Sequence, residues 1–436
     1  MFSVIIPVFN AEKTINKTMK SILDSIENME HEIIVINDGS TDDTLIKLDE
    51  WKNNEYIKVL NQENLGVSAA RNNGLSAISQ KSEFVTFIDD SDSISEDFFQ
   101  QYVNFFNKYN YLDVAVCKIE RIINGIETGH SLNYRFLDKD REIVDIFDDY
   151  NLIHFHIGGA VFRSTIFLDE EYRFDEKISF WEDAKLINTI LLEKRIYGLV
   201  SSATYFYDRS NRNSLSFESW NSVDRYNKHI RRNYFYLINK SLRTYNTVIP
   251  YVQYLIASHY IQYIIESNKD KIKREFIVSN NDFLKESRKL FKNIDLKIID
   301  ELKALPFYKA VLYKVKTKEM TVTLPKENIE VLGQSYNFLN QEMTFSFTNN
   351  YIGFVDNLRI YRKNVFGKEV LVTPSSYKKY KDPLFGMVNF KHFKVKLYLY
   401  EAFFKQVFII YDVNNDINIK IKSPSLFIRF LKRFLK

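Results

Sequence analysis

The sequence FVTFIDDSDSIS, residues 84–95, joins an apolar run to a cluster of acids. The run of apolar and β-branched residues is typical of a strand buried on both faces, as in a parallel sheet. Asp89, Asp90 and Asp92 follow it, and three carboxylates so close together require a countercharge. Hard divalent cations prefer oxygen ligands, and open α/β sheets bind ligands at the carboxyl ends of their strands. The stretch therefore predicts a metal–diphosphate site at a sheet edge. The alternative is a solvated acidic turn before the next helix.

The composition is that of a globular protein with more than one domain. The 436 residues are 45% hydrophobic and 27% charged, enough for the cores of two or three domains. The net charge of +4 is small for this length and gives no indication of nucleic-acid binding. A single cysteine, Cys117, excludes an intrachain disulfide, as is usual in a reducing compartment.

The chain shows neither a signal peptide nor a membrane-spanning run. Met1 leads directly into a strand-like segment without a basic region before it, and no stretch reaches about 18 consecutive apolar residues. We therefore expect a cytoplasmic protein, or one peripheral on the inner face of the plasma membrane.

Strand and helix patterns alternate through the first 120 residues, as in βαβ units. We expect strands at residues 2–8, 32–37, 57–60, 84–88 and 112–119. We expect helices at residues 12–26, 67–78 and 96–109, where apolar residues recur at helical spacing. Parallel order with right-handed crossovers predicts a Rossmann-like layer.

Polar residues follow other predicted strands too. Pro7, Val8 and Asn10 end the first strand, Asp38 ends the second within NDGST, and Arg71 lies one turn inside the helix of ENLGVSAARNNG. Alone, Asp38 could form an Asx turn and Arg71 a surface ion pair. Because the carboxyl ends of parallel strands meet at one edge, we expect these residues to line one crevice.

Together these motifs resemble those of the family 2 glycosyltransferases of GT-A fold, among them bacterial enzymes of capsule, teichoic acid and surface polysaccharide synthesis. The matching segments are VIIPVFN, VINDGSTDDT, NLGVSAARNNG and FIDDSD, in the family's order and spacing over about the first 100 residues. Weaker matches extend to about residue 217. In FWEDAKL, Glu182 and Asp183 resemble the family's catalytic acids, and YFYDRSNRNSLSF resembles the loop that closes over the donor diphosphate. One departure is Trp181, where related members usually carry a small residue such as Gly. A tryptophan there would narrow the acceptor site.

The resemblance implies a nucleotide-sugar site. Its residues would be Pro7, Val8, Asn10, Asp38, Arg71, Asp89, Asp90, Arg209, Arg212 and Ser214. Asp38 would accept a hydrogen bond from the base imide of what we expect to be a UDP-sugar. Asp92 would hold a Mn²⁺ or Mg²⁺ ion that bridges the diphosphate, with Asp90 as the second acid.

The residue types suit glycosyl transfer. Displacing a nucleoside diphosphate from a sugar C1 builds negative charge on the leaving oxygen, which a divalent ion stabilises. The acceptor hydroxyl needs a general base, and we assign this role to Asp183, with Glu182 orienting it or binding the acceptor. The alternative is an acidic pair that only interacts with the dipole of its helix.

The resemblance thus predicts an inverting, metal-dependent hexosyl- or N-acetylhexosaminyltransferase. The acceptor would be a hydroxyl of a cell-surface polysaccharide, a teichoic-acid-like polymer or a lipid-linked glycan. His154 and His156 alternate on an expected strand and would line the acceptor site or pack in the core. Gly158 and Gly159 would let the acceptor approach the backbone closely.

The chain is expected to divide into four parts. An α/β GT-A domain comes first, followed by a helical region, an antiparallel β-sandwich-like domain and a short terminal helix. The bounds are 1–217 for the catalytic domain, 218–319 for a helical linker domain, 320–422 for a β accessory domain and 423–436 for a basic amphipathic helix. The β domain would bind polymer, form a homo-oligomer or brace the catalytic domain. The last helix has an apolar stripe opposite four cations, which predicts contact with a membrane surface; docking on the β domain or another subunit is the alternative.

Two other functions compete with glycosyl transfer. A nucleotidyltransferase can share a nucleotide-binding α/β layer, but it would carry a Gly-rich basic loop after the first strand, and VFNAEKT lacks one. A non-catalytic carbohydrate-binding or scaffold protein would dispense with the acids, yet Asp90, Asp92 and Asp183 are all present.

Overall fold

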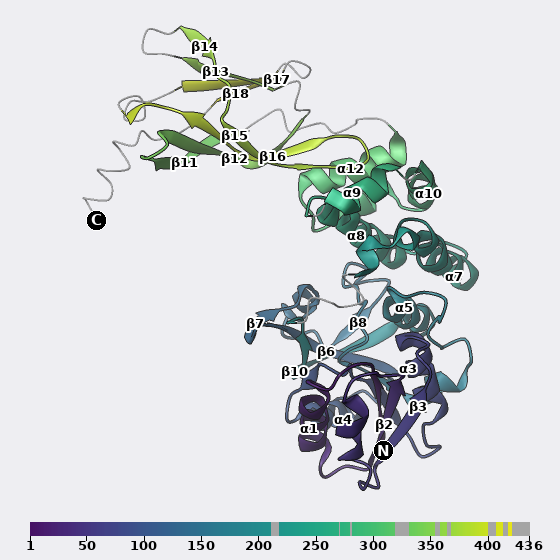
Figure 1. The fold of residues 1–436 in the computed structure, drawn as a ribbon. Helices are drawn as coiled ribbons and strands as arrows, with labels where there is room; N and C mark the ends of the chain where they lie inside the picture. Colours follow the sequence, from purple (N-terminus) through teal and green to yellow (C-terminus); the bar gives the residue numbers. More distant parts are fainter. Residues whose placement is uncertain are drawn as a thin grey trace. The chain divides into compact units, whose positions relative to one another are not determined.

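The computed structural model (Figure 1) describes residues 1–210, 218–269, 271–279, 281–318, 331–353, 358–363, 368–399, 407–412 and 417–420. These residues form two units, Met1–Ile256 and Ala257–Lys436. The expected boundaries at residues 217, 319 and 422 stay a prediction. The amphipathic segment at residues 423–436 lies outside the described residues.

A mixed sheet forms the centre of the first unit, with strand order β3-β2-β1-β4-β9-β6-β10-β5. The strands are β1 (Phe2–Val8), β2 (His31–Asp38), β3 (Ile57–Gln62), β4 (Phe84–Phe87), β5 (Ser93–Ile94), β6 (Val114–Ile123), β7 (Ile126–Gly129), β8 (Ile143–Asp145), β9 (Ala160–Arg163) and β10 (Ile196–Asp208). The five strands predicted in the first 120 residues are confirmed, and β1 to β4 are parallel. Strand β9 runs antiparallel between β4 and β6, so the layer is not purely parallel.

Helices cover both faces of this sheet because alternate residues of β1 point to opposite sides. Val4, Ile6 and Val8 pack in one core with residues of α1 (Ile15–Ile26) and α4 (Phe98–Lys108). On the other face, α3 (Val67–Ser76) lies so close to β1 that a Cβ on Gly74 would be 2.4 Å from a methyl carbon of Ile5. The other helices of this unit are α2 (Thr44–Asp49), η1 (Ser131–Phe136), η2 (Ser164–Leu168), α5 (Glu182–Lys194), η3 (Ser219–Asn221), η4 (Val223–Tyr226), η5 (Ile230–Tyr234) and α7 (Phe235–Tyr245).

The second unit contains helices and two antiparallel sheets. Its helices are the last part of α8 (Pro250–Ser267), then α9 (Lys271–Ser279), α10 (Asn281–Phe291), α11 (Leu296–Glu301) and α12 (Pro306–Thr317). One sheet has the order β11 (Val331–Asn337), β12 (Glu342–Gly353), β16 (Val388–Lys396), β15 (Ser376–Lys381). The other has the order β14 (Glu369–Leu371), β13 (Leu358–Lys363), β17 (Val407–Asp412), β18 (Ile417–Lys420).

The two sheets share one hydrophobic core, in which Ile360 of β13 packs with Phe345 of β12 and Phe393 of β16. The antiparallel, sandwich-like β region expected from the alternating sequence is therefore confirmed. In the described part of the chain, no helix is both long and apolar enough to cross a membrane.

Candidate functional site

The acidic turn after β4 is tied to the end of β1. The backbone N–H of Phe9 donates to Asp90 Oδ2 at 3.0 Å. The hydroxyl of Thr18, in α1, donates to the backbone carbonyls of Asp90 at 3.1 Å and Asp92 at 2.7 Å. The turn is thus fixed in place by two neighbouring elements, and its carboxylates lie at the carboxyl end of the parallel strands.

Asp38, at the end of β2, holds the loop that leads into α3. Its Oδ1 accepts from the N–H of Leu65 and from Gln62 Nε2, both at 2.8 Å, and its Oδ2 accepts from the N–H of Gly66 at 2.9 Å. Gly66 has a φ of 91°, a conformation that glycine adopts without a steric penalty. Asp38 therefore positions the loop, and only its remaining lone pairs are available to a nucleoside.

The other residues expected around the nucleoside also lie at this edge. Pro7 and Val8 are buried within β1, so their side chains belong to the core, whereas Asn10 is exposed beyond the end of the strand. Asn10 has a φ of 52°, and its Oδ1 accepts from the N–H of Thr41 at 2.8 Å. The loops after β1 and β2 are thereby joined.

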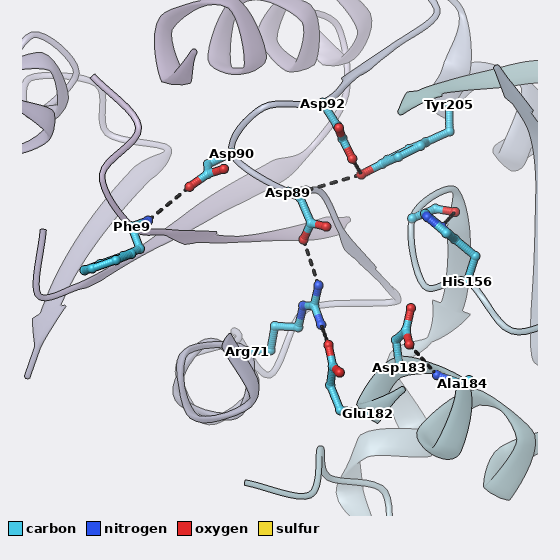
Figure 2. Close-up of polar contacts among 11 residues, drawn as sticks. Phe9, Arg71, Asp89, Asp90, Asp92, His156, Glu182, Asp183, Ala184 and Tyr205 are labelled. Carbon is cyan, nitrogen blue, oxygen red and sulfur yellow. Dashed lines mark hydrogen bonds and ion pairs between the residues drawn. The ribbon is translucent and has the colours of Figure 1, made fainter. Parts of the chain in front are cut away.

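Arg71 connects two motifs that lie far apart in the sequence (Figure 2). Its Nη2 donates to Asp89 Oδ1 at 2.7 Å and its Nη1 donates to Glu182 Oε1 at 3.1 Å. The guanidinium also stacks over Phe174, with its central carbon 5.2 Å from the ring centre. Arg71 is only 3% exposed, so it acts as a buried countercharge between the acidic turn and the acidic pair.

Glu182 and Asp183 occupy the first turn of α5. Glu182 points at Arg71, while Asp183 accepts the N–H of Ala184 at 2.7 Å and lies beside Glu182 in Figure 2. The helix starts after Trp181, whose φ of 68° is the left-handed conformation. That conformation is one that glycine adopts without a steric penalty and that a tryptophan rarely adopts.

Trp181 keeps this conformation through packing. Its indole lies 5.2 Å from the ring of Tyr234 and 5.9 Å from that of His229, measured between ring centres, and the residue is 5% exposed. Its effect on an acceptor site stays a prediction.

Asp92 faces Tyr205 rather than solvent. The Tyr205 hydroxyl donates to Asp92 Oδ2 at 2.6 Å and accepts from the N–H of Asp89 at 3.3 Å, as Figure 2 shows. The N–H of Asp208, at the end of β10, donates to Asp92 Oδ1 at 2.9 Å. Asp92 is 1% exposed, so these two donors fix the direction of its carboxylate.

Two glycines make room for Tyr205. A Cβ on Gly158 would lie 2.6 Å from the tyrosine ring, and one on Gly159 would lie 2.9 Å from its Cβ. The missing side chains therefore accommodate Tyr205, and the approach of an acceptor to the backbone here stays a prediction. Residues 153–157 form no strand, so His154 and His156 do not share a strand face as expected. His154 is buried, and its Nδ1 lies 2.6 Å from Nη1 of Arg135.

Burial determines the electrostatics of the acids. It raises the pKa of Asp90 to about 7, with the N–H of Phe9 opposing and Asp89 adding to the shift. It raises the pKa of Asp92 well above its ordinary value, and the neighbouring Asp89 adds to this. Ionised Asp90 and Asp92 are therefore disfavoured in the structure as it stands, and a nearby cation would favour their charged forms.

The pKa values of Glu182 and Asp183 are also raised. Burial raises the pKa of Glu182 to about 7, Asp183 adds to the shift, and Arg71 opposes it. Burial raises the pKa of Asp183 too, again against Arg71. A raised pKa brings such a carboxyl closer to neutral pH, where a general base works best.

The turn fits a divalent cation only together with a substrate. Among the described residues, no three or more His, Cys, Asp or Glu side chains form a group that could hold a metal ion. Asp92 nevertheless has lone pairs beyond the two that accept hydrogen bonds, and burial raises its pKa, so a cation beside it would favour the ionised form. Mg²⁺ is commonly held by one or two carboxylates plus substrate phosphates, and Asp92 and Asp90 are the carboxylates of the turn that would supply such ligands.

The expected diphosphate loop is described only in part. Arg209 follows β10, and its Nη1 donates to the Tyr207 hydroxyl at 3.4 Å. Arg212 and Ser214 lie outside the described residues.

Tyr205 is the contact that sequence reasoning missed. The segment YFYDRS was assigned to a loop, whereas it ends the long strand β10. The run TYFY, in which all four residues are aromatic or β-branched, was the available signal for a strand.

Comparisons with known proteins agree with this arrangement. The family model described as Glycosyl transferase family 2 matches residues 3–169. The chain is 34% identical over 380 residues to the Bacillus subtilis minor teichoic acid biosynthesis protein GgaA. This alignment covers 83% of this chain and 84% of GgaA. It is 25% identical over 207 residues to the Staphylococcus aureus poly(ribitol-phosphate) β-N-acetylglucosaminyltransferase TarS, covering 47% of this chain and 35% of TarS.

Solved structures of TarS are similar to the chain in fold. The crystal structure of S. aureus TarS aligns with a TM-score of 0.56 at 15% identity, over 97% of this chain and 78% of that chain. TarS residues 1–349 in complex with UDP-GlcNAc align with a TM-score of 0.56 at 18% identity, over 73% of this chain and 88% of that chain. At this identity the likeness concerns the fold alone, and it confirms the expected GT-A arrangement.

Proposed function

This chain belongs to glycosyltransferase family 2, and on that premise we propose that it transfers a sugar from a UDP-sugar to a hydroxyl of a teichoic-acid-like polymer, with inversion at the anomeric carbon. The observation that carries the proposal is the pair of contacts made by Arg71, to Asp89 at 2.7 Å and to Glu182 at 3.1 Å. They bring the acidic turn and the acidic pair into one site. The names of GgaA and TarS support the acceptor class, and TarS crystallised with UDP-GlcNAc supports a UDP-linked donor.

The donor would bind along the carboxyl edge of β1, β2 and β4. Asn10 is exposed at this edge, and Asp38 holds the neighbouring loop at residues 62–66 in position. Asp92, with Asp90, would hold Mn²⁺ or Mg²⁺ against the diphosphate. A cation bound there would neutralise charge on the leaving group.

Asp183 is the proposed general base. Glu182 is engaged by Arg71, whereas Asp183 accepts the backbone N–H of Ala184 on Oδ1. An oxygen of Asp183 would take the proton of the acceptor hydroxyl as that hydroxyl attacks C1. The bond from C1 to the diphosphate oxygen breaks on the opposite face, so UDP leaves with the bonding electron pair and the configuration at C1 inverts.

Arg71 has a positioning role in this scheme. Its pKa is held above the ordinary value by Asp89, Glu182 and Asp183, although burial lowers it, so it stays cationic throughout. A permanent charge between the two acidic segments fixes Glu182 and leaves its neighbour Asp183 to accept the proton.

The test compares UDP release from UDP-sugars, with poly(ribitol phosphate) as acceptor, in Mn²⁺ and in EDTA. We expect Asp183→Asn to lower kcat about 100-fold or more, the usual contribution of a general base, and to leave UDP binding intact. Asp92→Asn is expected to abolish the Mn²⁺-dependent part of UDP binding, measured by calorimetry.

Asp113→Asn is the matched control, since that carboxylate pairs with Lys194 at 2.9 Å, away from these residues. The proposal fails if Asp183→Asn keeps more than a tenth of the wild-type rate, or if no UDP-sugar is turned over by the wild-type protein.

A further inference from the structure

One face of the sheet β11-β12-β16-β15 carries a row of cations. Along β16, Phe393 and Val395 point into the hydrophobic core, so His392, Lys394 and Lys396 point to the opposite side. Lys378 of β15 lies directly across from His392 and shares its side. We call the outward side of this sheet the lysine face, and define it by Lys378, His392, Lys394 and Lys396.

Small polar residues separate these cations. Lys394 pairs with Ser376 on one neighbouring strand and with Thr344 on the other. His392 pairs with Ser346 on β12, and Lys396 pairs with Glu342, an acid at the margin of the face. The lysine face thus alternates cations with hydroxyl groups and carries no large apolar side chain at these positions.

Acids of the described residues leave the three lysines of this face without ion pairs. In the described parts of the chain, no ion pair includes Lys378, Lys394 or Lys396. The neighbouring Lys391 packs over Tyr380, with its Nζ 4.4 Å from the ring centre. The pKa of His392 is lowered, by burial first and then by Lys378, Lys394 and Lys391, which shows how closely these charges gather. A cluster of cations of one sign raises the local concentration of negatively charged partners.

We propose that the lysine face is a docking surface for a polyanionic polymer whose repeating unit carries a phosphodiester. The inference rests on the proposed function, because it assigns to the acceptor polymer a second contact outside the catalytic unit. Outward residues of one strand are about 7 Å apart and neighbouring strands about 5 Å apart, so the face offers cations at regular intervals to a repeating anion. The interleaved hydroxyls suit hydrogen bonds to the polyol or sugar between the phosphates.

The chemistry favours a polymer over a membrane surface. Membrane association of a protein surface generally needs apolar side chains that enter the lipid as well as basic residues, and the positions of β12, β15 and β16 named above carry none. A polymer held on this face would also raise the local concentration of acceptor hydroxyls for a catalytic unit on the same chain.

The test is binding of the full chain to purified poly(ribitol phosphate), measured by calorimetry at two salt concentrations. The variant Lys378→Gln/Lys394→Gln/Lys396→Gln is expected to bind about tenfold more weakly, because each exposed ion pair is worth only a few-fold in affinity. Its affinity should also depend less steeply on salt. The KM for long polymer should rise in parallel, with the hydrolysis of UDP-sugar in the absence of acceptor unchanged.

The matched control removes the same charge elsewhere in this unit. Lys285→Gln/Lys292→Gln/Lys297→Gln alters three exposed lysines of the helical segment and should bind polymer like the wild-type protein. Equal affinity of the lysine-face variant and the wild-type protein would overturn the proposal. So would binding to phosphatidylglycerol vesicles that the polymer does not compete away. If the wild-type protein binds polymer through these lysines but transfers no sugar to it, the docking surface stands and the proposed function fails.

Discussion

Replacing Arg71 by methionine tests whether a buried countercharge holds the site together. The substitution keeps the volume of the aliphatic stem and removes the donors to Asp89 and Glu182. Removing one partner of a buried ion pair typically costs 3–5 kcal/mol. Because the side chain of Asp89 is 35% exposed and can be solvated, we expect a loss near the lower limit, about 3 kcal/mol at pH 8.

The loss should depend on pH in a defined direction. A carboxyl with a raised pKa in the folded protein binds more protons when folded than when unfolded, so the stability it contributes is lost as pH rises through the folded pKa. With a pKa of about 7, Glu182 costs the wild-type protein about 1.4 kcal/mol between pH 6 and pH 8. Arg71 opposes the shift, so without it that pKa rises further and the same interval costs more, up to a limit of about 2.7 kcal/mol for a carboxyl that stays protonated throughout.

The destabilisation caused by Arg71→Met should therefore be larger at pH 8 than at pH 6, by at most about 1.3 kcal/mol. Urea titrations in EDTA, followed by tryptophan fluorescence, measure this difference. All three tryptophans, Trp51, Trp181 and Trp220, lie in the first unit and report on its unfolding.

Arg195→Met is the control for this measurement. Arg195 bonds Asp145 at the surface, and the pKa of Asp145 lies below its ordinary value because that bond outweighs burial, so Asp145 is ionised at both pH values. The free energy of unfolding that Arg195→Met loses should be small and equal at pH 6 and pH 8. A loss for Arg71→Met that is likewise independent of pH, or that stays below 1 kcal/mol, would refute the reasoning.

Two further outcomes follow from the site. Tyr205→Phe removes the donor to Asp92 and should weaken Mn²⁺ binding in the presence of UDP about tenfold, because partners that orient a metal ligand contribute on that scale. Electron paramagnetic resonance measures this affinity. An unchanged Mn²⁺ affinity would show that Tyr205 does not orient the carboxylate. Glu182→Gln removes the negative charge beside Asp183, so the pKa of Asp183 should fall and the acidic limb of the kcat/KM profile should move to lower pH; a shift to higher pH, or none, would argue against Asp183 as the base.

Local patterns of apolar residues in the sequence predicted many of the strands and helices. The apolar runs before Asn10 and Asp89 predicted β1 and β4, and the helical spacing of residues 12–26 predicted α1. Such patterns are readable because the side-chain periods of strands and helices are set by the backbone within a few residues. The motifs at the strand ends were informative for the same reason, since parallel strands bring their carboxyl ends together.

The sequence by itself thus determined the α/β class, the acidic turn and the identity of the acidic pair. Only the tertiary structure decided that Arg71 joins Glu182 across 111 positions, that Tyr205 directs Asp92 across 113, and that Trp181 occupies a left-handed turn. Each of these depends on how distant elements pack, and packing selects one partner for a buried polar group among the many that the sequence permits. The periodicity of a helix or strand depends on residues close together in the sequence, whereas the pairing of buried charges depends on contacts between elements that are distant in the sequence.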